Sequence, residues 1–100
     1  MTISKRVFAM WSISMSELKL VYFAWVRERV GLSEERVSVP DSVLTVADLA
    51  GWLQSRGEEY AYAFENPAIV RAAINHKHVK PDASIAGASE IAFFPPMTGG

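Results

Sequence analysis

The residues with the clearest chemical potential close the chain, which ends Phe93-Phe94-Pro95-Pro96-Met97-Thr98-Gly99-Gly100. Proline cannot donate to a sheet ladder, so Pro95-Pro96 stops any strand, and paired prolines favour the stiff polyproline II form. Gly99 and Gly100 have no Cβ, so their backbone fits a slot too narrow for other residues. Six extended residues reach roughly 20 Å, at about 3.3–3.6 Å each. The pattern indicates an arm that carries the terminal carboxylate into another protein's active site. The alternative is an unstructured chain end.

Composition limits the classes of protein to which this chain can belong. One hundred residues make one domain, with 50% hydrophobic and 21% charged residues, as in soluble globular proteins. A net charge of −1 without a basic stripe argues against nucleic-acid binding, and no stretch approaches the roughly 20 apolar residues of a membrane span. The chain has no cysteine, which excludes disulfides, thiolate zinc sites and cysteine nucleophiles, and is compatible with a cytoplasmic protein.

The first fourteen residues differ from the rest. Lys5-Arg6 followed by Val7-Phe8-Ala9-Met10-Trp11 is similar to a short signal peptide, but no A-x-A-like cleavage site follows. We expect residues 1–14 to be an extension outside the core fold, with an added edge strand as the alternative. Residues 15–94 then form the domain and residues 95–100 the tail.

Two strands are predicted in the first part of the domain. Residues 18–26 are apolar on both faces, as in a central strand, with Leu18, Leu20, Tyr22 and Ala24 on one face. Residues 27–33 are expected to form a loop in which Gly31 adopts a positive φ. Residues 36–39 alternate Arg, Val, Ser, Val, which predicts a second strand antiparallel to the first.

A helix is predicted over residues 46–56. Thr45-x-x-Asp48 fits a capping box, and Leu44 and Leu49 stand where a hydrophobic staple would close. Gly57 is expected to end the helix in the left-handed conformation. One helical face is apolar, formed by Val46, Leu49, Ala50 and Leu53.

The sequence of the second half of the domain predicts one short helix and three strands. Residues 58–64 form the short helix, which Asn66-Pro67 ends, and residues 69–75 form a strand. A turn at residues 76–78 leads into a short strand near Val79, and Glu90–Phe94 is the last strand. This order indicates an α+β fold with a mixed sheet, in which the last strand lies beside the first and gives the tail a rigid root.

The tail closely resembles the C-terminus of the MoaD-type small subunits of molybdopterin synthase. Weaker resemblances are residues 23–28 with Gly31, Thr45-Val46 with Leu49, and Ala73-Ile74-Asn75, so the likeness covers about residues 17–100. It implies a ubiquitin-like β-grasp fold with a mixed sheet of about five strands. One main helix would pack on one face of the sheet, followed by a short second helix.

The resemblance also implies a chemistry. A partner enzyme adenylates the carboxylate of Gly100 with ATP, and sulfur then replaces one oxygen to give a thiocarboxylate. The large synthase subunit, which would hold the catalytic pocket, receives the tail and builds a dithiolene from cyclic pyranopterin monophosphate. By resemblance, Gly100 carries the sulfur while Gly99, Thr98, Met97, Pro96 and Pro95 thread the slot. The chain would hold no cofactor and would form a heterotetramer with the large subunits.

The partner surface is predicted from three residues. Phe23 and Phe94 could form an apolar patch on an open sheet face beside the tail, or could be core residues under a helix. Arg27 could form an ion pair with the partner or be solvated. Two positions depart from the family pattern: residues 86–90 replace an acidic turn, and His78 stands where an apolar residue is expected.

The sequence also raises a metal site and three functional alternatives. His76 and His78 have the spacing of one strand face, but a metal site needs further ligands, so we expect solvated histidines and no metal. The functional alternatives are a sulfur carrier for another pathway, such as thiamine thiazole synthesis, and a ubiquitin-like modifier joined to lysines through Gly100. A pure interaction domain, in which the tail is dispensable, is the remaining one.

Overall fold

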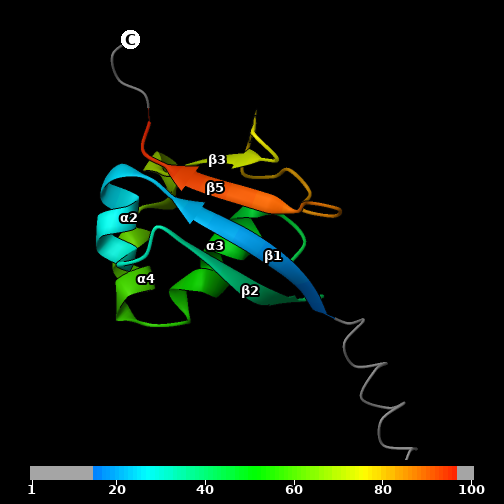
Figure 1. Ribbon diagram of the computed structural model, residues 1–100, viewed down its shortest axis with the longest axis horizontal. Helices are drawn as coiled ribbons and strands as arrows, with labels where there is room; N and C mark the ends of the chain where they lie inside the picture. Colours follow the sequence, from blue (N-terminus) through cyan, green and yellow to red (C-terminus); the bar gives the residue numbers. More distant parts are fainter. Residues whose placement is uncertain (1–14, 97–100) are drawn as a thin grey trace, which may run out of the picture.

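The computed structural model describes residues 15–96, so the predicted N-terminal extension and the last four tail residues lie outside the described residues. The described chain forms one five-stranded sheet with the order β2-β1-β5-β3-β4 (Figure 1). The strands are β1 (Met15–Tyr22), β2 (Glu34–Pro40), β3 (Arg71–Ile74), β4 (Lys77–Val79) and β5 (Glu90–Phe94). The helices are α2 (Ala24–Val30), α3 (Val46–Gln54), α4 (Glu58–Ala63) and the 3-10 turn η1 (Pro67–Ile69).

The pairing confirms the predicted mixed sheet. β1 pairs antiparallel with β2 and parallel with β5, and β3 pairs antiparallel with both β5 and β4. The last strand is therefore central and lies beside the first, as expected. The third strand is shorter than predicted because η1 occupies its beginning, where the Val70 N–H donates to the Pro67 carbonyl (3.2 Å).

The first strand lies earlier than predicted, over Met15–Tyr22 instead of residues 18–26, and the expected loop after it was wrong. β1 ends at Tyr22, and the Phe23 N–H makes a last sheet contact with the Phe93 carbonyl (3.0 Å). Ala24 has a φ of 53°, which turns the chain out of the sheet into α2. Val26 and Val30, four residues apart, are buried on one face of this helix.

Gly31 ends α2 in the way the sequence indicates. Its φ is 91°, and its N–H donates to the Arg27 carbonyl at 2.8 Å, a left-handed C-cap. The prediction of a positive φ at Gly31 is therefore confirmed, although the residue closes a helix instead of lying within a loop.

The start of α3 is confirmed and its end is not. The Asp48 N–H donates to Thr45 Oγ1 (3.1 Å) and the Thr45 N–H donates to Asp48 Oδ2 (3.2 Å), which is the predicted capping box. The staple is absent, because Leu44 is 63% exposed. The helix ends at Gln54, and Gly57 is the extended N-cap of α4, with a φ of 165°, instead of a left-handed cap.

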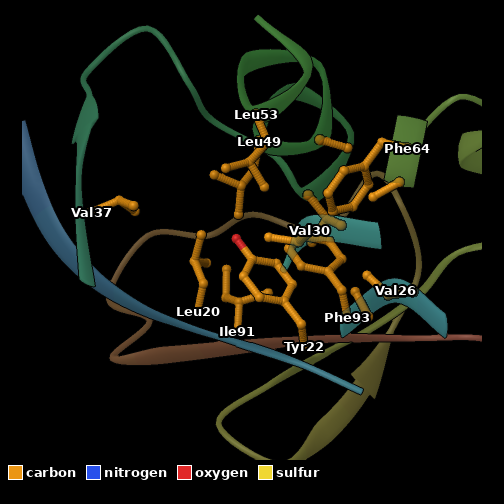
Figure 2. Packing of buried hydrophobic residues seen from close by; sticks show 14 of the residues in the cluster. Leu20, Tyr22, Val26, Val30, Val37, Leu49, Leu53, Phe64, Ile91 and Phe93 are labelled. Carbon is orange, nitrogen blue, oxygen red and sulfur yellow. The ribbon is translucent and has the colours of Figure 1, made fainter. Parts of the chain in front are cut away.

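The core lies between one face of the sheet and helices α3 and α4. Figure 2 shows the side chains of β1 and β5 pointing toward those of α3 and the end of α4. The Phe93 ring meets Phe64 edge-on, with ring centroids 5.0 Å apart, and lies 6.3 Å from Tyr22. Of the residues predicted to share a face, Leu18, Leu20 and Tyr22 are buried, whereas Ala24 is exposed on α2. The central strand that leads to the tail is thus held by large buried side chains.

A polar network closes one edge of this core. Glu35 Oε2 accepts hydrogen bonds from the hydroxyls of Tyr22 and Tyr60, both at 2.8 Å, and Glu35 Oε1 lies 3.2 Å from Arg56 Nη1. The Arg56 guanidinium also lies over the rings of Tyr60 and the half-buried Trp52. Burial, and the bond to Glu35, raise the pKa of Tyr22 well above its usual range and the pKa of Tyr60 to about 12.

We expect the native chain to lose stability above about pH 10 more steeply than a Tyr60→Phe variant. The folded pKa of Tyr60, about 12, is higher than its ordinary value of 10.0, so the fold favours the neutral phenol. That contribution to the free energy of unfolding is complete below pH 10.0 and is lost as the pH rises toward about 12.

The measurement is the urea midpoint of unfolding at about pH 8 and about pH 11, on either side of the ordinary tyrosine pKa. Tyr62→Phe is the matched control, because Tyr62 is an exposed tyrosine of the same helix, packed on Arg29 instead of Glu35. Equal pH dependence in the native chain and Tyr60→Phe would refute the expectation.

Candidate functional site

The tail begins at the end of the central strand. β5 lies between β1 and β3, with Val21 opposite Ala92 on one side and Arg71 opposite Phe94 on the other. The ladder stops at Phe94, and Pro95-Pro96 has no N–H to continue it. β1 runs parallel to β5, so the tail leaves the sheet beside the point where β1 gives way to α2 (Figure 1).

An open depression of about 500 Å³ lies beside this exit. It brings together Phe23, Phe94, Pro95 and Pro96, four of the residues that the sequence singled out. Phe23 is 47% exposed and Phe94 is half-buried, while α3 and α4 pack on the opposite face of the sheet. The alternative that a helix covers both phenylalanines was therefore wrong. Their role in docking a partner stays a prediction.

The floor of the depression was missed by the sequence analysis. Ala73 and Ala92 pair across β3 and β5 and line the depression with small side chains. Each lies next to a residue that faces the core, Ala72 and Phe93 respectively. The available signal was this alternation of small outward residues with buried inward ones in two strands.

His78 lies on the open face of the sheet, beside Phe94. Its ring lies 5.0 Å from the ring of Phe94, between centroids, and the two planes are tilted by 45°. His78 thus packs on one of the predicted docking residues. His76 lies in the preceding turn with a φ of 74°, so the two histidines do not share a strand face. Within residues 15–96, no group of three or more metal-ligating side chains is present.

The other end of the depression is charged and well fixed. Glu90 lies 4.0 Å from Lys19 Nζ and 3.9 Å from His76 Nε2. Asn75 Oδ1 accepts hydrogen bonds from the Ser89 N–H (3.1 Å), the Ser89 hydroxyl (3.0 Å) and the Glu90 N–H (3.0 Å). These bonds hold the turn over residues 86–90 and set the start of β5.

Arg27 lies on α2 instead of in a loop, and its side chain is exposed. The ion pairs among the described side chains do not include it. Both predicted roles, an ion pair with a partner and simple solvation, therefore stay predictions.

Comparison with known proteins decides the family. The model of the ThiS family matches residues 20–100, which include the whole sheet from Leu20 onward and the tail. The chain belongs to the ThiS family. The molybdopterin synthase sulfur carrier subunit of Haemophilus influenzae is 31% identical to this ThiS-family chain over 83 residues, which is 83% of this chain and 99% of that one. The Escherichia coli protein of the same name is 35% identical over the same shares.

Solved structures agree on the fold. The putative molybdopterin converting factor, subunit 1, of Pyrococcus furiosus has a TM-score of 0.64 at 27% identity, covering 81% of this ThiS-family chain and 98% of that one. SAMP1 of Haloferax volcanii has a TM-score of 0.63 at 24% identity, covering 85% and 100%, and supports the fold alone. The predicted β-grasp fold and the predicted sulfur carrier of the molybdopterin synthase type are confirmed. In the part of the chain that the structure describes, no helix is long and apolar enough to cross a membrane.

Proposed function

We propose that this chain donates sulfur from a thiocarboxylate at Gly100 to cyclic pyranopterin monophosphate, as a subunit of molybdopterin synthase. The observation that carries the proposal is the continuation of the central strand β5 into Pro95-Pro96 and the Gly-Gly end, in a chain aligned with sulfur carrier subunits over 99% of their length. The alternative of a modifier is supported by the likeness to small archaeal modifier proteins such as SAMP1, which at less than 25% identity supports the fold alone.

Sulfur loading proceeds in two steps, adenylation of the carboxylate and replacement of AMP by sulfur. A carboxylate oxygen of Gly100 attacks the α-phosphorus of ATP, and pyrophosphate leaves. A hydrosulfide ion bound by the activating enzyme then adds to the acyl carbon, and AMP departs with the oxygen, which leaves the thiocarboxylate and one proton. In the transfer step, the thiocarboxylate sulfur bonds to a carbon of the pterin, and water then cleaves the bond between the acyl carbon and the sulfur to restore the carboxylate. The chain supplies the carbonyl carbon, and its partners supply the catalytic groups.

The physical contribution of this chain is to deliver one carbon atom to a fixed place. The tail is anchored at β5, and two prolines reduce the number of conformations that it loses on entering a partner. Phe23 and Phe94, with Pro95 and Pro96, dock the partner through the open depression. Arg27, exposed on the neighbouring α2, is positioned to pair with an acidic side chain of that partner.

The partners follow from this role. An adenylating enzyme consumes ATP, and a large synthase subunit accepts the sulfur in a heterotetramer, while this chain itself holds no cofactor. The reaction takes place in the cytoplasm. Because both partners receive the same tail, each must release the chain before the other can bind.

The test is the intact mass of the chain after incubation with a matching activating enzyme, ATP and a sulfur donor. We expect a gain equal to the mass difference between sulfur and oxygen, localised to Gly100 and absent without ATP. An unchanged mass would contradict the proposal, provided the enzyme loads another carrier and the chain is folded.

A second measurement identifies the recipient. The loaded chain is mixed with a large synthase subunit and cyclic pyranopterin monophosphate, and should return to the carboxylate form as molybdopterin appears. Sulfur delivered only to a thiazole precursor would place the chain in another pathway. Gly-Gly remnants on the lysines of other proteins that trace to this chain would indicate a modifier.

A further inference from the structure

A second pocket lies on the helical side of the sheet, on the face opposite Phe94. It has a volume of about 450 Å³, and it lies between α3, the segment around η1, and strands β3 and β4. The buried rings of Phe64 and Phe93, which Figure 2 shows in the core, form part of its wall. Ligand pockets in proteins typically occupy about 300–1,000 Å³ and are mostly apolar. Its size and lining therefore match those of a ligand pocket.

The pocket is open because α3 presents small residues to it. Ala47, Ala50 and Gly51 line it from the helix. A Cβ added at Gly51 would meet no heavy atom within 4 Å, so the space above this glycine is empty. Glycine is a poor residue for the middle of a helix. The exposed Gly51 therefore leaves room for an occupant to approach the helix backbone.

One charged side chain borders the pocket. Lys80 lines it and is exposed, and among the described side chains it takes part in no ion pair. Arg71 also lines the pocket, but it pairs with Phe94 across β3 and β5, so its side chain lies on the face of Phe94. The polar Gln54 is already engaged, since its amide donates to the Phe64 carbonyl at 2.7 Å. An apolar pocket with one uncompensated cation at its border suits an apolar molecule that carries one negative group.

We propose that this pocket binds a small free amphiphile, with an apolar body and a single carboxylate, sulfonate or phosphate group. The body would lie on Phe64 and Phe93 beside Gly51, and the anionic group would lie near Lys80. This site is distinct from the tail exit, because Phe93 faces the pocket whereas Phe94 lines the depression on the other face. It does not depend on the proposed sulfur transfer.

The test uses two probes that differ in charge alone. 8-Anilinonaphthalene-1-sulfonate carries a sulfonate, and N-phenyl-1-naphthylamine has the same rings without it. Each is titrated into the full-length chain, and backbone amide NMR shifts locate the probe. We expect the sulfonate to bind about tenfold more tightly than the neutral probe, the effect of one charge-assisted contact. The shifts should centre on Gly51, Ala72 and Val79, which line the pocket.

Two variants separate the contributions of space and charge. Gly51→Leu fills the empty space and favours the helix, so it should stay folded and lose binding of both probes. Lys80→Ala removes the charge at the border of the pocket and should bind both probes alike. Leu44→Ala, which removes an exposed apolar side chain outside the pocket, should bind as the native chain does.

Several outcomes would overturn the proposal. They are shifts centred on Phe23 and Phe94, full binding by Gly51→Leu, equal affinity of the native chain for the two probes, and no binding of either probe. A concentration-dependent dimer that Gly51→Leu abolishes would show that a second copy occupies the pocket. If Gly51→Leu binds a tail-receiving enzyme more weakly than the native chain does, the pocket instead holds a segment of that enzyme. A Gly100 deletion should lose sulfur loading and still bind the probes. Failure of the proposed sulfur transfer can therefore be distinguished from failure of the proposed pocket.

Discussion

Deletion of Gly100 is expected to reduce sulfur loading of the chain by more than about 10²-fold. The deletion moves the terminal carboxylate back by one residue, about 3.3–3.6 Å along an extended chain. A misplacement of about 1 Å in a reacting group can already cost roughly 10²-fold in rate, because the acyl carbon no longer meets the group that attacks it. The stiff prolines before the glycines limit how far the chain can compensate.

The fold should not change in this variant. The β5 ladder ends at Phe94, and the core residues of β5 are Ile91 and Phe93, all several residues before the deletion. The measurement is the rate of thiocarboxylate formation by intact mass, with the urea midpoint of unfolding as the control for folding.

A chain extended by one extra glycine is the matched variant. It keeps every native residue of the tail but moves the carboxylate forward by one residue, so we expect it to be loaded poorly as well. Loading of the deletion variant at the native rate would show that another group accepts the sulfur, and the proposed function would then be wrong.

The parts of the fold that were predicted correctly have local causes. The capping box of Thr45 and Asp48 needs two side chains three residues apart, and the last strand has a continuous apolar run that prolines end. Gly31 can adopt its left-handed conformation because glycine has no Cβ. Each of these signals lies within a few residues, so the sequence contains all of it.

The errors arose where contacts distant in sequence decide the structure. Residues 23–26 have aromatic and β-branched side chains typical of a strand, but they leave the sheet because Ala24 turns the chain with a positive φ. Val26 and Val30 then pack as a helix on the core. The spacing of these two valines before Gly31 was the signal that could have predicted α2.

The open face of the site could be predicted in part. The sequence placed Phe23 and Phe94 near the tail but left undecided whether a helix covers them. That choice depends on the face of the sheet on which α3 packs, which no local pattern reports. The structure shows α3 and α4 packed on the face of Phe93 instead. Neighbouring phenylalanines thus have different surroundings.

Phe93 and Phe94 are adjacent, and we expect their alanine variants to fail in opposite ways. Phe93 is 1% exposed and packs against Phe64 and Tyr22, so Phe93→Ala leaves a cavity in the centre of the core. Such substitutions cost about 3–5 kcal/mol. A domain of this size has a free energy of unfolding of about 5–15 kcal/mol, so much of it would be lost. The midpoint of urea unfolding should fall sharply.

Phe94→Ala should change stability by about 1 kcal/mol or less, because the side chain is half-buried on the open face and contacts His78. Its expected effect is on partner binding. An aromatic anchor in an interface contributes about 2 kcal/mol or more, which corresponds to a loss of roughly 30-fold in affinity. Affinity for the large synthase subunit, measured by calorimetry on the folded variant, checks this.

The pair of variants distinguishes docking from simple packing. If the open face serves no partner, Phe94→Ala will bind as tightly as the native chain, and the proposed docking role fails even if sulfur loading succeeds. If Phe94→Ala unfolds as readily as Phe93→Ala, the residue contributes mainly to the core. If Phe94→Ala folds as stably as the native chain but binds the large subunit weakly, then Phe94 docks the partner. Stability and affinity then depend on opposite faces of one strand.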